Sequence, residues 1–178
     1  MQHPRERGVP VNTARIASLC LPAADVHVGI RFDPRVFSDP NRPAVLLYPG
    51  PEAIDVEQNP PPTEITLVVV DGTWSQTKKL IQLNPELAAL PRYAFRPNVP
   101  SAYRIRRQPR ADCVSTLEAL MHVLGAIEGD RERFVSMMRP FRAMVEAQIA
   151  FALKRPDLAP AVRSFLRNYV GECTRENA

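Results

Sequence analysis

The chain has 178 residues with 45% hydrophobic side chains, enough for one domain with its own core. No apolar run approaches the roughly 20 residues that span a bilayer, and the first seven residues lack the apolar core of a signal peptide, so we expect a cytoplasmic protein without a membrane segment. The net charge of +4 favours an anionic partner. The three cysteines are too widely spaced for a tetrahedral metal site or a disulfide framework; they are Cys20, Cys113 and Cys173.

Short strands and helices alternate in the first half of the chain. Asn12 is a typical N-cap residue and predicts a helix that ends at Pro22. Residues 26–32 alternate apolar and other side chains, which is typical of a strand, and the apolar run at residues 44–48 predicts another. A proline at the start of residues 51–54 then favours the first turn of a helix.

The most strongly predicted strand is residues 65–70, which lead directly into Asp71-Gly72-Thr73-Trp74. Their nearly continuous apolar, β-branched composition indicates burial on both faces, as in the centre of a parallel sheet. A helix is expected over residues 75–83, with Thr73 and Gln76 at the spacing of a capping box.

The four residues Asp71 to Trp74 lie where open α/β sheets bind ligands, after a buried strand and before a helix. Gly72 permits a close turn, the helix start suits a carboxylate or phosphate, and Trp74 offers a flat apolar surface. Asp71 offers an acceptor for ribose hydroxyls or for a proton. A simple turn, a cap at Thr73 and a core position for Trp74 explain the same residues, so the pattern alone leaves both interpretations open.

A second helix start follows at Ser115-Thr116-Leu117-Glu118, where Ser115 and Glu118 have the spacing of a capping box. The cap is by itself a sufficient reason for these residues. If this helix starts near the first one, the two also complete a polar pocket that suits a charged amino-acid group.

Two amphipathic stretches indicate that helices dominate the second half of the chain. Their apolar stripes are Leu117, Leu120, Met121, Leu124 and Ile127 in the first, and Phe134, Met138, Phe141, Val145 and Ile149 in the second. Pro140 predicts an interruption or a kink in the second stretch, and residues 160–169 predict a last helix. The expected class is α/β with a helical C-terminal part.

Residues 103–107 alternate as a strand does, with Arg104 and Arg106 on one face and Tyr103 and Arg107 on the other. Arginines placed in this way contact successive phosphates, and a tyrosine stacks on a base. A solvated edge strand that is protected by its charges explains the segment equally well.

Six segments together resemble the DTW-domain family, the tRNA-uridine aminocarboxypropyltransferases. Each segment is short, but all six occur in the family's order. They are QHPRER with NTAR at residues 2–15, LLYPGPEA at 46–53, LVVVDGTW at 67–74, LNPELAALPR at 83–92, PSAYRIRRQP at 100–109 and STLEAL at 115–120.

The resemblance implies a SPOUT-like fold, in which helices flank a mostly parallel sheet and a knotted region holds S-adenosylmethionine. It implies one DTW domain over residues 1–178, with its motif core at 2–125 and a helical C-terminal part at 126–178. Many relatives begin with a cysteine cluster that looks zinc-binding, and this sequence starts just after where that cluster would lie. We therefore expect no metal here.

The resemblance also assigns residues to the site. Those expected to bind the cofactor are Leu47, Tyr48, Pro49, Asp71, Gly72, Thr73, Trp74, Ser115, Thr116 and Glu118. Those expected to bind RNA are Arg5, Arg15, Lys78, Tyr103, Arg104, Arg106 and Arg107.

The implied reaction transfers the aminocarboxypropyl group of S-adenosylmethionine to N3 of a uridine in tRNA and releases methylthioadenosine. Because uridine N3–H is a weak acid, a carboxylate that accepts its proton helps, and Asp71 is the candidate for this catalytic role. Binding of ribose hydroxyls is the rival role for Asp71. Two other functions remain open: an S-adenosylmethionine-dependent RNA methyltransferase, and a non-catalytic RNA-binding module that keeps the arginines and tolerates loss of Asp71.

Overall fold

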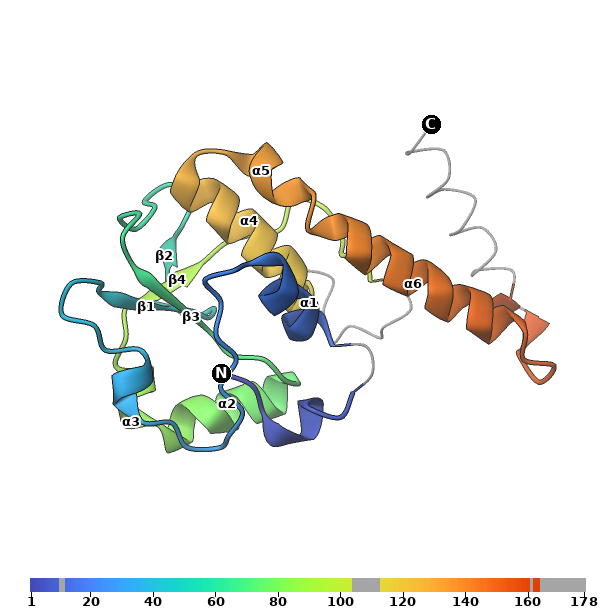
Figure 1. Cartoon of the computed structure of the whole chain (residues 1–178), viewed down its shortest axis with the longest axis horizontal. Helices are drawn as coiled ribbons and strands as arrows, with labels where there is room; N and C mark the ends of the chain where they lie inside the picture. The colour runs from blue at the N-terminus through green and yellow to red at the C-terminus, as the bar shows by residue number, and fades with distance from the viewer. Residues whose placement is uncertain (10–11, 104–112, 161, 164–178) are drawn as a thin grey trace.

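A computed structural model describes residues 1–9, 12–103, 113–160 and 162–163 of the chain (Figure 1). Strands and helices are interspersed up to residue 94, and helices follow from residue 116. The elements in chain order are η1 (Pro4–Glu6), α1 (Thr13–Cys20), η2 (Pro34–Val36), β1 (Ala44–Leu47), β2 (Ile54–Asp55), β3 (Thr66–Val69), α2 (Trp74–Leu83), α3 (Pro85–Ala88), β4 (Arg92–Ala94), α4 (Thr116–Glu128), α5 (Arg131–Val135) and α6 (Met138–Leu153). This order confirms the α/β class with a helical C-terminal part.

The described strands form a parallel sheet in the order β2-β4-β1-β3. Strand β1 is central: Leu46 lies opposite Val68 of β3, and Leu47 lies opposite Tyr93 of β4. Because the strands are parallel, their carboxyl ends meet at one edge of the sheet, where α/β proteins bind ligands. Tyr48 follows β1 at this edge, and Asp71 follows β3.

Successive residues of the strands contribute to different hydrophobic cores, as the two-residue period of a strand requires. Leu46, Val68 and Val70 pack with Ile81 of α2 and Leu87 of α3. The core on the other face contains Leu47, Val56 and Val123 of α4, with Leu67 and Val69 packed against it. The sheet is therefore covered on both faces, with α2 and α3 on one side and α4 on the other (Figure 1).

Strand β3 is covered on both faces, as predicted, but it lies at the end of the sheet and not at its centre. The first residues of the chain run along its outer edge. The backbone N–H of Asp71 donates to Met1 O at 2.9 Å, and the N–H of His3 donates to Asp71 O at 3.0 Å. The start of the chain thus satisfies backbone groups that an edge strand leaves unpaired, which a local sequence pattern does not reveal.

Two local predictions from the first half of the chain were wrong. Residues 26–32 form no regular strand, since Val28 alone makes a bridge, to Gln2, and the apolar side chains of Val26, Val28 and Ile30 are exposed. Residues 51–54 do not begin a helix. The N–H of Ala53 closes a turn onto Gly50 O at 3.1 Å, which uses Pro51 as a turn residue, and Ile54 then starts β2.

A third core joins α1, α4, α5 and α6, and it buries all five apolar residues of the stripe predicted between positions 134 and 149. The stretch is interrupted, as predicted, but the interruption lies before Pro140 and not at it. The helix is interrupted at Ser136 and Met137, and Pro140 is the third residue of α6. A proline in the first turn of a helix removes an N–H that has no partner within the helix, so α6 continues through it.

Figure 1 shows α6 extending away from the sheet, beyond the end of α4. The predicted helix over residues 160–169 and the predicted strand over residues 103–107 lie largely outside the described residues. In the part of the chain that the structure describes, no helix combines the length and the apolar character needed to span a membrane.

Candidate active site

Asp71 is a buried carboxylate at the carboxyl edge of the sheet, with 8% of its surface exposed. Its Oδ2 accepts hydrogen bonds from Gln2 Nε2 at 3.0 Å and from Asn12 Nδ2 at 3.1 Å. Its Oδ1 accepts one from the hydroxyl of Thr116 at 2.8 Å. Segments far apart in the sequence are therefore brought together at one side chain.

Two of the three side chains that donate to Asp71 lie where helices begin. Asn12 is the N-cap of α1, Thr116 is the first residue of α4, and α2 starts three residues after Asp71 itself. Unpaired N–H groups give a helix start a partial positive charge, which stabilises a nearby anion. Hydrogen bonds and helix starts therefore converge on the Asp71 side chain. Close by, burial lowers the pKa of the Met1 amino group to about 6, and attraction to Asp71 partly opposes that shift.

The start of α2 is fixed by the predicted capping box. Gln76 N donates to Thr73 Oγ1 at 3.4 Å, and Thr73 N donates to Gln76 Oε1 at 2.6 Å. Gly72 fits closely beneath this box, because a Cβ at that position would lie 2.9 Å from Gln76 Oε1 and 3.2 Å from Gln76 Cβ. The glycine lets the chain turn from Asp71 into the helix without displacing the capping side chain.

We expect Gly72→Ala to lower the free energy of unfolding by about 0.5–2 kcal/mol, the usual cost of losing a helix cap. The added methyl group must displace Gln76 and break its bond to Thr73. Gly8→Ala is the matched control, because a Cβ at Gly8 meets no atom within 4 Å. Urea unfolding measures both variants, and equal midpoints for the two would contradict this account of Gly72.

Trp74 and Tyr48 form an aromatic pair at the same edge of the sheet. Their ring centroids are 5.9 Å apart, with an angle of 56° between the rings. The Trp74 side chain is 45% exposed, so the alternative that it is a core residue is excluded. An exposed indole beside a helix start is a surface on which a flat or apolar group can pack.

Ser115 and Glu118 form the second predicted capping box, at the start of α4. Glu118 is buried, and both of its carboxylate oxygens accept hydrogen bonds from the chain. Its Oε1 accepts from Ala102 N at 2.7 Å, and its Oε2 accepts from Ser101 Oγ and from Ser115 N, each at 2.7 Å. Glu118 therefore ties Ser101 and Ala102 to the helix start instead of presenting its oxygens to a ligand, which differs from the role predicted for it.

Comparison with known families supplies the decisive observation, since the model of the DTW domain matches residues 1–149. The chain belongs to the DTW-domain family. It is 31% identical over 159 residues to tRNA-uridine aminocarboxypropyltransferase 2 of Macaca fascicularis, 32% identical over 162 residues to that of Mus musculus, and 30% identical over 160 residues to that of Drosophila melanogaster. Each alignment covers 84% of this chain, but only 53%, 53% and 63% of the respective relative. No solved structure matches significantly.

The other residues of this DTW domain that were predicted to bind the cofactor differ in how exposed they are. Pro49 and Thr73 are exposed beside the aromatic pair, and Thr116 is half-buried. Leu47 and Ser115 are buried; the Leu47 side chain lies in the core against Val56 and Val123, so only its backbone is available at the sheet edge.

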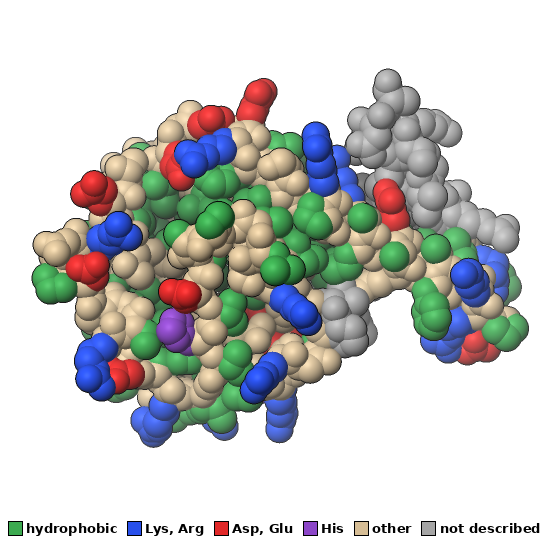
Figure 2. Space-filling view, in the orientation of Figure 1, with side chains coloured by type: hydrophobic (Ala, Val, Ile, Leu, Met, Phe, Trp, Pro, Cys, Tyr) green, Lys and Arg blue, Asp and Glu red, His purple; other side chains and the backbone are tan. Residues whose placement is uncertain are grey.

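Three of the predicted RNA-binding residues are exposed on elements that meet at Asp71. Arg5 is in η1, Arg15 is in α1 and Lys78 is in α2, and none of them forms an ion pair among the residues the structure describes. Figure 2 shows Lys and Arg side chains projecting along the lower margin of the molecule, where α2 lies in Figure 1.

The predicted stacking of Tyr103 on a base needs correction. The side chain is only 7% exposed, and its ring packs edge-on against Phe141 of α6, with centroids 5.4 Å apart. An aromatic ring held in the core in this way has no free face for a base. Arg104, Arg106 and Arg107 lie outside the described residues.

Gln2 and Asn12 were missed as site residues by the sequence interpretation. Both lie in the N-terminal segments that match the family motifs, QHPRER and NTAR, but Asn12 has a local explanation as a helix cap. Its Oδ1 does accept from Arg15 N at 2.8 Å, as a cap does, while its Nδ2 reaches Asp71. The available signal was the presence of polar amide side chains inside family motifs.

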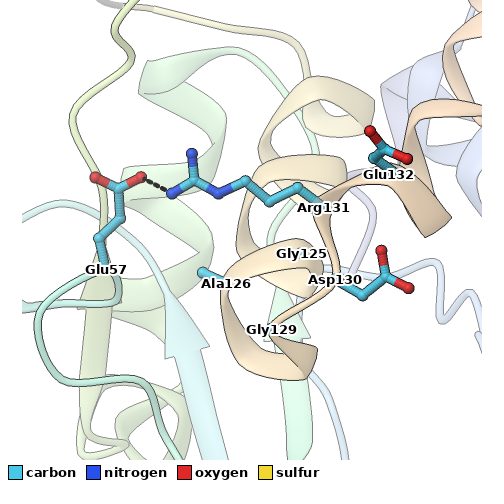
Figure 3. A pocket seen from close by; sticks show the side chains of 7 residues that line it. All are labelled: Glu57, Gly125, Ala126, Gly129, Asp130, Arg131 and Glu132. Atoms are coloured by element: carbon cyan, nitrogen blue, oxygen red, sulfur yellow. Dashed lines mark hydrogen bonds and ion pairs between the residues drawn. The ribbon is translucent and has the colours of Figure 1, made fainter.

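An open hollow of about 520 Å³ lies elsewhere, at the end of α4 remote from Thr116. Figure 3 shows its lining, in which Arg131 of α5 reaches across to Glu57 with an N–O distance of 2.7 Å. The hollow contains none of the residues around Asp71. Among the described residues, no group of three His, Cys, Asp or Glu side chains is arranged to hold a metal ion. The expected absence of a metal stays a prediction.

Proposed function

We propose that this DTW domain transfers the aminocarboxypropyl group of S-adenosylmethionine to N3 of a uridine in tRNA and releases methylthioadenosine. The observation that carries the proposal is the buried Asp71 carboxylate, held by Gln2, Asn12 and Thr116 at the carboxyl edge of the sheet. The names of the three relatives support this reaction, although the chain spans little more than half the length of the two mammalian ones.

The residues at the sheet edge fit the group donor. Trp74 and Tyr48 offer an exposed aromatic surface for its adenosine or methionine part. The start of α2 offers the Thr73 and Ser75 hydroxyls, 3.1 Å apart, together with helix N–H groups that suit a carboxylate. We also propose that this binding site has the SPOUT-like knotted arrangement.

In the proposed mechanism the donor supplies an electrophilic carbon beside its sulfonium, and the chain orients that carbon toward uridine N3. The aromatic pair and the start of α2 perform this positioning, which determines whether the aminocarboxypropyl carbon or the methyl carbon is attacked. Asp71 accepts the N3 proton. Gln2 and Asn12 fix its orientation.

The alternative function within enzymes is an S-adenosylmethionine-dependent RNA methyltransferase. Incubation with tRNA and S-adenosylmethionine, followed by chromatography of the small products, distinguishes the two. The proposal predicts methylthioadenosine as the product that accumulates with tRNA, whereas S-adenosylhomocysteine would show methyl transfer. Neither product above a control without tRNA would favour a non-catalytic RNA-binding module.

We propose that Arg5, Arg15 and Lys78 bind phosphates of the tRNA. Changing all three to alanine should weaken tRNA binding and reduce its salt dependence by a slope of about 0.7–0.9 for each phosphate that the protein no longer binds. Arg155→Ala is the matched control, because Arg155 already pairs with Asp157 at 2.5 Å. Affinities measured at several salt concentrations provide the test, and parallel lines for the triple variant and wild type would contradict binding of phosphates by these residues.

A further inference from the structure

We propose that the hydroxyl of Thr116 relays the proton from the uridine nucleophile to Asp71. This inference rests on the proposed function and makes its proton path specific. It assigns proton transfer to Thr116, a residue that the family resemblance assigns to binding of the cofactor.

The limited exposure of Asp71 is the first argument. With 8% of its surface exposed and its oxygens hydrogen-bonded to three side chains, the carboxylate has little room for direct contact with a base. Thr116, at the start of α4, is half-buried and its hydroxyl bonds Asp71 Oδ1 at 2.8 Å, so the residue joined to the carboxylate is more exposed than the carboxylate itself.

The chemistry of the three donors is the second argument. The amide nitrogens of Gln2 and Asn12 donate, but their lone pairs are delocalised into the carbonyl groups and do not accept a proton. A hydroxyl both donates and accepts. Among the described residues, both amides bind Oδ2 and the hydroxyl is the donor to Oδ1, so one carboxylate oxygen is held by fixed donors and the other is connected to a relay.

The donors to Glu118, the second buried carboxylate of the region, differ from those to Asp71. Two of the donors to Glu118 are backbone N–H groups, and the third is the hydroxyl of Ser101, which is only 4% exposed and accepts from Tyr103 N at 3.0 Å. Ser101 is thus a buried residue, whereas Thr116 is half-buried. A relay to the surface is therefore present at Asp71 and absent among the described partners of Glu118.

The transfer balances as follows. The N3–H bond breaks, its electron pair forms the new bond from N3 to carbon, and its proton passes to Thr116 Oγ. The original hydroxyl proton of Thr116 passes to Asp71 Oδ1, which becomes a neutral carboxylic acid. The carbon–sulfur bond breaks with its electron pair on sulfur, which leaves as a neutral thioether. Asp71 Oδ2 keeps both amide hydrogen bonds throughout.

Two substitutions separate the relay from simple packing. Thr116→Val keeps the shape and removes the hydroxyl, and we expect turnover to fall about 10²-fold or more, as for loss of a general acid–base group. Thr116→Ser keeps the hydroxyl and should stay within a few-fold of wild type. Affinity for S-adenosylmethionine, measured by calorimetry, separates the relay from the cofactor contact predicted for Thr116, because a role in the relay alone leaves this affinity unchanged in both variants. The deficit of the valine variant should shrink as the pH rises toward ionisation of N3–H, because an ionised nucleophile needs no relay.

Several results would overturn the relay. A folded valine variant with turnover within about threefold of wild type would do so, as would equal losses in the serine and valine variants, or a deficit that stays constant with pH. If the valine variant does not fold, Thr116→Ala replaces it with the same expectations. Wild-type protein that makes no methylthioadenosine would overturn the proposed function together with the relay, whereas active wild type with an active valine variant would overturn the relay alone.

Discussion

Turnover is expected to fall about 10²–10⁴-fold in Asp71→Asn, the usual range for loss of a general base, while the chain stays folded. Asparagine has the shape of aspartate, and its oxygen can accept from Gln2 and Asn12. Its amide nitrogen then faces Thr116, whose hydroxyl can turn to accept instead of donate. The substitution removes the charge, and the asparagine can replace each hydrogen bond that Asp71 makes. Steady-state rates of methylthioadenosine release measure the effect.

Two comparisons make this result specific. Asp25→Asn, at an exposed aspartate, should leave turnover unchanged. Asp71→Ala should also destabilise the fold, because each buried donor left without an acceptor costs about 1–3 kcal/mol. Near-normal turnover in the asparagine variant with undisturbed affinity for S-adenosylmethionine would eliminate Asp71 as the base. A loss of that affinity alone would make it an anchor for ribose hydroxyls.

Phe141→Ala is expected to lower the free energy of unfolding by about 3–5 kcal/mol, the largest effect on stability that we predict. Phe141 is fully buried in the core shared by α1, α4, α5 and α6, and Tyr103 packs on its ring. Its removal leaves a cavity beside the segment that Glu118 ties to α4. Arg142→Ala, on the exposed side of α6, should change stability by less than about 0.5 kcal/mol. Urea unfolding of both variants provides the measurement, and a decrease of less than about 1 kcal/mol in Phe141→Ala would contradict this packing.

Local patterns predicted the parts of the site that are built from neighbours in sequence. Both capping boxes, at Thr73 and at Ser115, are present because a cap depends on residues three positions apart. The stripe from Phe134 to Ile149 is buried because a helix repeats every 3.6 residues. The position of Asp71 at a strand end followed from composition and spacing alone.

The rest depends on contacts that no local pattern encodes. Gln2 and Asn12 reach Asp71 across 69 and 59 residues of chain. Strands β2 and β4 have two and three residues, which is too short to show the alternating pattern of a strand. Strand β4 nevertheless lies between β1 and β2 in the sheet. Tyr103 has the sequence context of a nucleic-acid contact, but its burial is decided by Phe141, 38 positions later.

Mass spectrometry of tRNA nucleosides tests the central claim most directly. After incubation of tRNA with the protein and S-adenosylmethionine, the digest should contain a uridine that is heavier by one aminocarboxypropyl group, and Asp71→Asn should reduce its amount by the same factor as turnover. A digest in which the nucleosides gain methyl groups alone, or are unchanged while the protein binds both tRNA and S-adenosylmethionine, would contradict the account.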